Sequence, residues 1–294
     1  MHKSSLRWLM RLVAFFAFAL ASMSAQNTPW FFAILSDPQM GMYAHDRDFA
    51  QETANLELAV ASLNRLHPQF VVVCGDLVNR TGDAAEIAEY KRILQKLDPS
   101  VPVYNVAGNH DLGNVPTPKS IRAYRAAFGK DFYSFTAGPV FGIVLDSSLI
   151  SAPQKTSDAA RQQRQWLADT LKNAPAGRQI IVFQHIPYFI HDAAEKDEYF
   201  NIPGPQRSEY LDLLRKAGVR SVFAGHYHRN AGGTDGPLNE VVTGAVGMPI
   251  GGSLSGLRLV SVSGNSVESR WYCLGDIPNQ VVPGPGLLSS HCPQ

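Results

Sequence analysis

Residues 70–76 read FVVVCGD, five apolar residues in a row followed by Gly75 and Asp76. A short, continuous apolar run rich in Val is typical of a strand buried on both faces of a parallel sheet. An Asp at its carboxyl end offers an oxygen ligand of the kind that divalent cations bind. The stretch therefore predicts a buried strand that delivers a carboxylate to one edge of a sheet.

The rest of the chain repeats this strand pattern and alternates it with helical periodicity. Apolar runs occur at 31–35 (FFAIL), 101–107 (VPVYNVA), 141–145 (FGIVL), 180–183 (IIVF) and 221–224 (SVFA). Helical stretches fall at about 47–66, 83–97, 118–128, 158–173 and 206–217, with Asp83 and Asp158 as candidate N-caps. This alternation predicts an α/β fold in one domain. Three strand-like pieces without helices follow residue 238, which favours a mixed sheet over a purely parallel one.

Potential metal ligands follow five of the predicted strands. They are Asp37 and Gln39, then Asp76, then Asn109, His110 and Asp111, then His185, and finally His226 and His228. Ligands bind outside the carboxyl ends of the strands in an α/β sheet, so we expect these side chains to share one crevice. A single Asp or His in such a place is usually a turn, cap or core residue. Five such endings in succession instead predict a metal site.

The donor types narrow the choice of metal. Carboxylate, amide and imidazole ligands together suit Mn, Fe or Zn better than a soft thiolate site would. The donors outnumber what one tetrahedral ion can use. Two ions about 3.5 to 4 Å apart, sharing a bridging carboxylate, would use them all.

The ordered motifs resemble those of the calcineurin-like metallophosphoesterase superfamily. The matching series is Asp37-x-Gln39, Gly75-Asp76-x-x-Asn79, Gly108-Asn109-His110-Asp111, His185 and Gly225-His226-x-His228, from about Phe31 to Tyr272. The stretches SDPQ, GNHDLGN, FQHIP, EYFNIP and GHYHRNAGG are most similar to the branch that contains serine/threonine phosphatases with a calcineurin-like phosphoesterase domain. The resemblance implies two packed mixed β-sheets flanked by helices, the metallophosphoesterase sandwich.

The same resemblance implies a role for each ligand. Asp37, Asp76 and His228 would hold the first metal, assisted by Gln39, and Asp76, Asn109, His185 and His226 would hold the second. A metal-bridging hydroxide would then attack phosphorus in line. His110, held by Asp111, would protonate the leaving oxygen or, with Asn109, bind the phosphate. Gln39 departs from the broad family pattern, which has His there, so we expect weaker binding at the first site.

Other residues near these motifs have alternative interpretations. Asp146 ends the fourth predicted strand, which suggests a hydrogen-bond partner for a ligating His. Arg80 and Arg229 follow ligand blocks and would either contact substrate or lie on the surface. The segment 188–205 contains four aromatic residues and would form either a substrate rim or packing contacts.

The first 25 residues resemble a secretory signal peptide. Lys3, Arg7 and Arg11 precede the apolar stretch 12–21, and small residues follow it. The ten apolar residues at 12–21 cover only about half of a bilayer's hydrocarbon core, which disfavours the alternative of an uncleaved anchor. We therefore expect export to the periplasm or the medium, a domain at 27–275 and a Pro/Gly-rich tail at 276–294. In an oxidising compartment Cys273 and Cys292 could pair, whereas Cys74 is expected to be a buried packing residue.

Composition limits the functional classes further. The chain of 294 residues is 45% hydrophobic and carries 26 basic against 25 acidic side chains, which indicates a globular protein. Without the three basic residues of the signal peptide, 23 basic side chains face 25 acidic ones, which argues against a nucleic-acid partner. The leading interpretation is a phosphomonoesterase for phosphoproteins or small phosphate esters. A phosphodiesterase and a non-catalytic metal-binding or partner-binding module are the alternatives, and the sequence predicts no oligomeric state.

Overall fold

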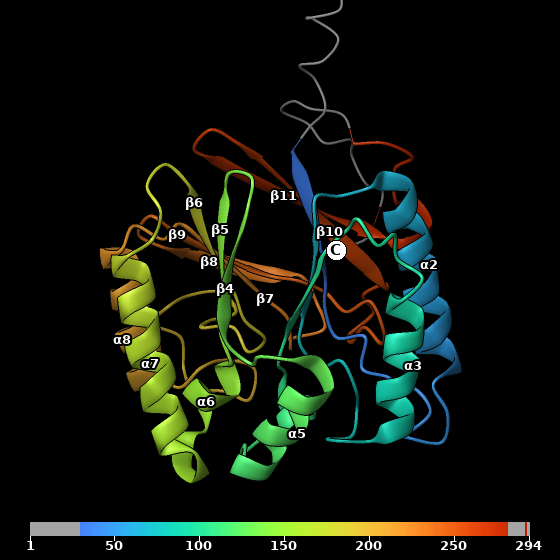
Figure 1. Cartoon of the computed structure of the whole chain (residues 1–294), viewed down its shortest axis with the longest axis horizontal. Helices are drawn as coiled ribbons and strands as arrows, with labels where there is room; N and C mark the ends of the chain where they lie inside the picture. Colours follow the sequence, from blue (N-terminus) through green and yellow to red (C-terminus); the bar gives the residue numbers. More distant parts are fainter. Residues whose placement is uncertain (1–29, 282–291, 293–294) are drawn as a thin grey trace, which may run out of the picture.

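Two mixed β-sheets pack against each other at the centre of the molecule, and helices cover their outer faces (Figure 1). The computed structural model describes residues 30–281 and residue 292. The first sheet has the order β11-β10-β1-β2-β3, formed by Ser266–Cys273, Gly256–Ser263, Phe31–Leu35, Val71–Cys74 and Val103–Val106. The second has the order β4-β5-β6-β7-β9-β8, formed by Tyr133–Ala137, Val140–Val144, Gln179–Phe183, Ser221–Ala224, Leu238–Val242 and Ala231–Asp235. The predicted sandwich of mixed sheets is confirmed.

The helices divide between the two outer faces and the lower edge in Figure 1. The first sheet is covered by α2 (Ala50–Leu66) and α3 (Ala84–Leu94), and the second by α7 (Ser157–Lys172) and α8 (Gly204–Lys216). The helices α4 (Asn109–Leu112), α5 (Pro118–Phe128) and α6 (Ser147–Ser151) follow the carboxyl ends of β3 and β5 in the chain. No helix among the described residues is long and apolar enough to cross a membrane.

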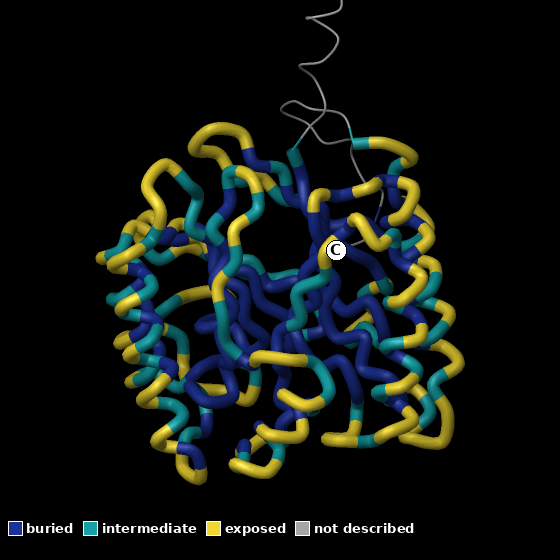
Figure 2. Tube along the Cα trace, in the orientation of Figure 1, coloured by how far each residue is buried: buried dark blue, intermediate teal, exposed yellow. Residues whose placement is uncertain are grey.

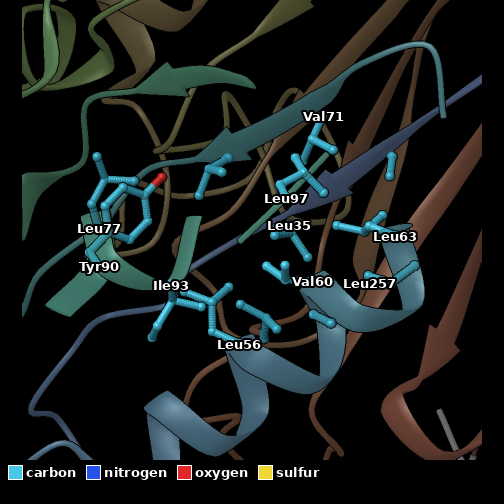
Figure 3. Close-up of a cluster of buried hydrophobic side chains, with 14 of the residues drawn as sticks. Leu35, Leu56, Val60, Leu63, Val71, Leu77, Tyr90, Ile93, Leu97 and Leu257 are labelled. Atoms are coloured by element: carbon cyan, nitrogen blue, oxygen red, sulfur yellow. The ribbon is translucent and has the colours of Figure 1, made fainter. Parts of the chain in front are cut away.

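Strands β1 and β2 are buried on both faces because each side of the first sheet is covered. Successive side chains of a strand point to opposite faces. Phe32 and Val72 pack between the two sheets, whereas Leu35 and Val71 pack under the helices (Figure 3). Figure 2 shows the result, with buried strands at the centre of the molecule and helices exposed on their outer side. This double burial explains why these strands are continuous apolar runs.

Parallel pairing sets where the strands end. β1, β2 and β3 run parallel, and β5, β6, β7 and β9 also run parallel to one another. The carboxyl ends of three strands in the first sheet (β1, β2 and β3) and of two in the second (β6 and β7) therefore carry the loops with the predicted ligands. After β9 the chain returns to this edge, where the amide of Gly247 donates to the Asp37 carbonyl at 3.1 Å.

Several local predictions can be compared with the structure. Asp83 caps α3, accepting from the amides of Ala85 and Glu86, as predicted. The prediction of Asp158 as a cap is wrong, because α7 begins at Ser157 and Thr156 occupies the N-cap position. The short elements β4, β8, α4 and α6 were not predicted. Their runs of four or five residues are too short for a clear period.

The cysteines are placed as predicted. Cys273 and Cys292 form a disulfide with Cα atoms 5.8 Å apart, and Cys74 is buried between the sheets. The signal peptide predicted at 1–25 lies outside the described residues, as does the tail from 282 to 291. The domain boundaries there stay predictions.

Candidate metal centre

Five predicted ligands lie in left-handed backbone where their strands end. The φ angles are 49° for Asp37, 38° for Gln39, 49° for Asp76, 67° for His226 and 55° for His228. Such conformations cost on the order of 1 to 3 kcal/mol each for residues other than Gly, and they persist only where the surroundings enforce them. The two packed sheets supply that enforcement.

The loops bring the ligand atoms into two overlapping groups. Asp37, Asp76 and His228 offer ligand atoms that all lie within 4.8 Å of one another, and so do Asp76, His185 and His226. All five residues are buried. Asp76 belongs to both groups, which is the geometry that a carboxylate bridging two cations requires.

The first group is oriented by hydrogen bonds to the backbone. His228 donates through Nδ1 to the carbonyl of Met248 at 2.5 Å, and its Nε2 lies 3.3 Å from Asp37 Oδ1. The Asp37 carboxylate also accepts from the amide of His226 at 3.2 Å. A His that donates through one ring nitrogen presents the other as a ligand, so the His228 Nε2 atom faces the site.

Gln39 adds a fourth candidate donor to the first group. Its side chain is buried, and its Nε2 donates to Asn79 Oδ1 at 3.0 Å. Its Oε1 atom is buried without a hydrogen-bond partner. A buried acceptor without a partner is costly, so this amide oxygen suits a cation.

In the second group His185 lies against two other predicted ligands. Its Nε2 is 2.9 Å from Asn109 Oδ1 and 3.1 Å from Asp76 Oδ2, while Nδ1 donates to the Cys74 carbonyl at 2.9 Å. Asn109 donates through Nδ2 to Asn114 Oδ1 at 2.7 Å, which turns its Oδ1 toward His185. Ligand atoms of Asp76, Asn109 and His185, which follow three different strands, therefore converge here.

The charges of the two groups are coupled. Burial raises the pKa of Asp76, but the adjacent His185 overrides burial and holds that pKa below its usual range. Burial lowers the pKa of His185, but Asp76 overrides it and raises that pKa to about 9. Burial and the neighbouring His185 lower the pKa of His226 to about 4. A cation bound at His185 would therefore displace a proton.

His110 and Asp111 are arranged differently from the prediction. The prediction that Asp111 holds the His110 ring is wrong. His110 donates through Nδ1 to the Asn79 carbonyl at 2.7 Å, and its own amide donates to Asp76 Oδ1 at 2.8 Å. Asp111 is buried and accepts from the amides of Leu77, Val78 and Gly108 at 3.0, 3.2 and 2.8 Å. It ties the loop after β2 to the loop after β3.

The prediction that Asp146 is a hydrogen-bond partner for a ligating His is also wrong. Its carboxylate caps α6 by accepting from the amides of Ser148 and Leu149 at 3.0 and 3.2 Å, instead of contacting a ligating His. Arg80 forms ion pairs with Asp83 and Glu86, which favours the surface interpretation for this side chain.

The segment 188–205 was predicted to form either a substrate rim or packing contacts, and different parts of it do each. Tyr188 and Phe189 are buried in the core under α8. Tyr199 and Phe200 lie at the site, with ring centroids 4.9 and 5.6 Å from that of His226. Arg229 stacks on Tyr227 with its guanidinium carbon 4.8 Å from the ring centroid.

Three main-chain carbonyls that orient His side chains at the site could not be predicted from the sequence. The carbonyls of Asn79, Met248 and Tyr199 orient His110, His228 and His226. Every residue carries a main-chain carbonyl, so no residue type marks this role. Asn79 and Tyr199 lie in stretches that resemble the family, whereas Met248 lies in none of them.

Gly108 permits the close approach of two ligand loops. A methyl group built on its Cα would overlap the Asp76 carboxylate and amide, and would lie 2.9 Å from the Asp76 Cα. Any side chain at this position would thus displace the shared carboxylate.

Comparison with known proteins agrees with this geometry. The family model for the calcineurin-like phosphoesterase (Metallophos) matches residues 32–230. The chain belongs to the calcineurin-like phosphoesterase family. It is a metal-dependent phosphoric ester hydrolase, as predicted.

Individual relatives place the chain within this family. It is 37% identical over 266 residues to the Bos taurus serine/threonine-protein phosphatase CPPED1, covering 85% of both chains. It is 28% identical over 188 residues to a probable cyclic nucleotide phosphodiesterase of Rhodopseudomonas palustris, covering 60% of this chain and 64% of the relative. Among solved structures, a dimetal phosphatase from Danio rerio has a TM-score of 0.58 at 18% identity, covering 83% of this chain and 99% of that one.

Gly108→Ala is expected to weaken metal binding, because the added methyl group must push Asp76 out of position. Overpacking of this kind costs about 1 to 3 kcal/mol, so metal affinity should fall by about 5- to 150-fold. Calorimetric titration of the metal-free protein with Mn²⁺ measures the effect. Gly275→Ala is the control, because a methyl group there meets nothing within 4 Å. Equal affinities for both variants would contradict the argument.

Proposed function

We propose that the protein is an exported, dinuclear metal-dependent phosphatase that hydrolyses phosphomonoesters of phosphoproteins or small molecules. The observation that carries the proposal is the pair of ligand groups that share Asp76. The extent of similarity to CPPED1, a protein named as a serine/threonine phosphatase, supports a phosphorylated substrate.

The donor sets fit two divalent cations of different preference. Asp37, Asp76 and Gln39 offer three oxygens beside one imidazole in the first group. The second group offers two imidazoles beside Asp76 and the Asn109 amide oxygen. Mn suits the oxygen-rich first site, and Zn or Fe suits the second. When bound, the two cations supply water activation at neutral pH and neutralise phosphoryl charge.

His110 is the proposed proton donor to the leaving oxygen. A carbonyl oxygen only accepts, so the Asn79 carbonyl fixes a proton on His110 Nδ1 and leaves Nε2 to exchange the other proton. His110 is half-buried, whereas the residues of the two ligand groups are buried. The bond from its amide to Asp76 ties its position to the shared ligand.

A phosphodiesterase is the second candidate, because the Rhodopseudomonas palustris relative is named as one. The bound cations provide the positive charge for an anionic ester, so a protein near neutrality needs no basic patch for either substrate. A module that binds metal without catalysis would have no need of His110. Turnover of p-nitrophenyl phosphate and its bis ester by metal-loaded protein separates these functions.

Export rests on the order of basic, apolar and small residues in positions 1–25 and gains support from the Cys273–Cys292 disulfide. Such bonds persist in oxidising compartments. We expect protein isolated from its native host to begin between Ser22 and Asn27 and to be found outside the cytoplasm. N-terminal sequencing that returned an intact Met1 would refute this.

Substitutions at Asp76 and His110 should separate metal assembly from proton transfer. Asp76→Ala should lose bound metal together with activity on every ester. His110→Ala should keep its metal, because His110 belongs to neither ligand group. Its rate should fall by ~10² to 10⁴ on an alkyl phosphate, and by less on p-nitrophenyl phosphate, whose leaving group needs little protonation.

Steady-state kinetics and elemental analysis of both variants measure these effects. Asp98→Ala is the matched control for the removal of a carboxylate, because the Asp98 side chain is 44% exposed and precedes β3 at the end opposite to the ligands. Equal losses on the two esters in His110→Ala would contradict the role of proton donor.

Gln39→His should tighten the first site. Imidazole is a stronger donor than an amide oxygen to borderline metals, so we expect Zn²⁺ affinity to rise by ~10-fold. The unmodified protein should be purified with fewer than about two equivalents of metal and be activated by added Mn²⁺. Gln51→His, exposed on α2, is the control. Full occupancy before and after the Gln39 substitution would show that residue 39 does not tune the site.

A further inference from the structure

Tyr199 lies beside the second ligand group and has no role in the mechanism above. Its side chain is 58% exposed, yet its hydroxyl oxygen is 3.3 Å from Asn109 Nδ2. Its main-chain carbonyl accepts from His226 Nε2 at 3.0 Å. The residue thus contacts two proposed ligands while more than half of its surface remains exposed.

The segment that carries Tyr199 is held by polar contacts from Glu195 on one side and from the buried Arg207 on the other. Glu195 accepts from the amides of Ile190 and His191 at 2.7 and 2.9 Å, and from Asn201 Nδ2 at 2.7 Å. Arg207 is buried and donates to the carbonyls of Ile202, Ala193 and Glu195 at 3.1, 3.1 and 2.9 Å. The position of Tyr199 is therefore preorganised before a ligand binds.

The direction of the hydrogen bond between Asn109 and Tyr199 leaves the Tyr199 hydroxyl proton available as a donor. Asn109 Oδ1 faces His185, so its Nδ2 group is the donor in the contact with Tyr199. The Tyr199 hydroxyl accepts this bond, and its own proton has no acceptor among the described residues. A phenol can accept and donate at the same time. The free O–H proton is thus presented at the exposed side of the metal centre.

We propose that Tyr199 is a specificity-determining residue whose hydroxyl donates to a phosphoryl oxygen and favours phosphomonoesters over diesters. The inference rests on the proposed phosphatase function. A monoester dianion carries three non-bridging oxygens, whereas a diester carries two and has an ester group in place of the third. The Tyr199 hydroxyl, fixed beside the ligands, stabilises the third oxygen of a monoester. When a diester binds, the hydroxyl has no such oxygen to donate to.

Tyr199→Phe in the full-length, metal-loaded protein tests the proposal. It removes the hydroxyl and keeps both the ring and the carbonyl that orients His226. Hydrogen bonds to charged groups predict a loss of about 10- to 100-fold in kcat/KM for p-nitrophenyl phosphate. The loss for the bis ester should stay under about threefold, and metal content should not change. Tyr104→Phe is the control, because Tyr104 stacks on Phe135 between the sheets.

Titration with inorganic phosphate provides a readout that does not depend on turnover. Its Kd should rise by about 10- to 100-fold in Tyr199→Phe and stay at the wild-type value in Tyr104→Phe. If the wild-type protein hydrolyses neither ester, the proposed function fails, and the phosphate titration still tests Tyr199. An unchanged Kd, an equal loss on both esters, or a loss of metal in Tyr199→Phe would each overturn the proposal.

Discussion

The shared position of Asp76 is the constraint on which the rest of the site depends. Its carboxylate is buried, lies 3.1 Å from His185 Nε2, and accepts from the His110 amide at 2.8 Å. Asp37 brings a second buried carboxylate into the same ligand group. Two buried negative charges this close repel each other unless positive charge lies between them. In the protein alone His185 supplies that charge, and bound cations would replace its proton.

The scaffold explains how such an unfavourable cluster can form. The parallel strands in both sheets end at one edge, and the packed apolar layer between the sheets holds these ends in place. The left-handed turns at Asp37, Asp76 and His226 then direct side chains from different strands toward one centre. Stability is concentrated in the strands, and strain is concentrated in the loops that bear the ligands.

The sequence predicted the fold and the gathering of ligands because both depend on local patterns. Continuous apolar runs identified the buried strands, and the residue types that end them identified the site. Asp146 illustrates the limit of this reasoning. It follows an apolar run as Asp76 does, yet its carboxylate caps α6. Whether an Asp after a strand caps a helix or faces a metal depends on the backbone that follows it, and the short helix α6 has too few residues to be recognised from its period.

The contacts of Asp111 and Gln39 required the structure for a related reason. The family resemblance implied that Asp111 would hold His110, but the helical turn of α4 directs the carboxylate to backbone amides instead. Gln39 has a donor end and an acceptor end, and sequence cannot say which faces the site. Asn79 determines this, because its Nδ2 donates to Asp46 and its Oδ1 must therefore accept from Gln39. The Gln39 oxygen is left without a hydrogen-bond partner and free to bind a cation, while the carbonyl of the same Asn79 accepts from His110. One residue outside the ligand set thus orients both an oxygen donor and the proposed acid.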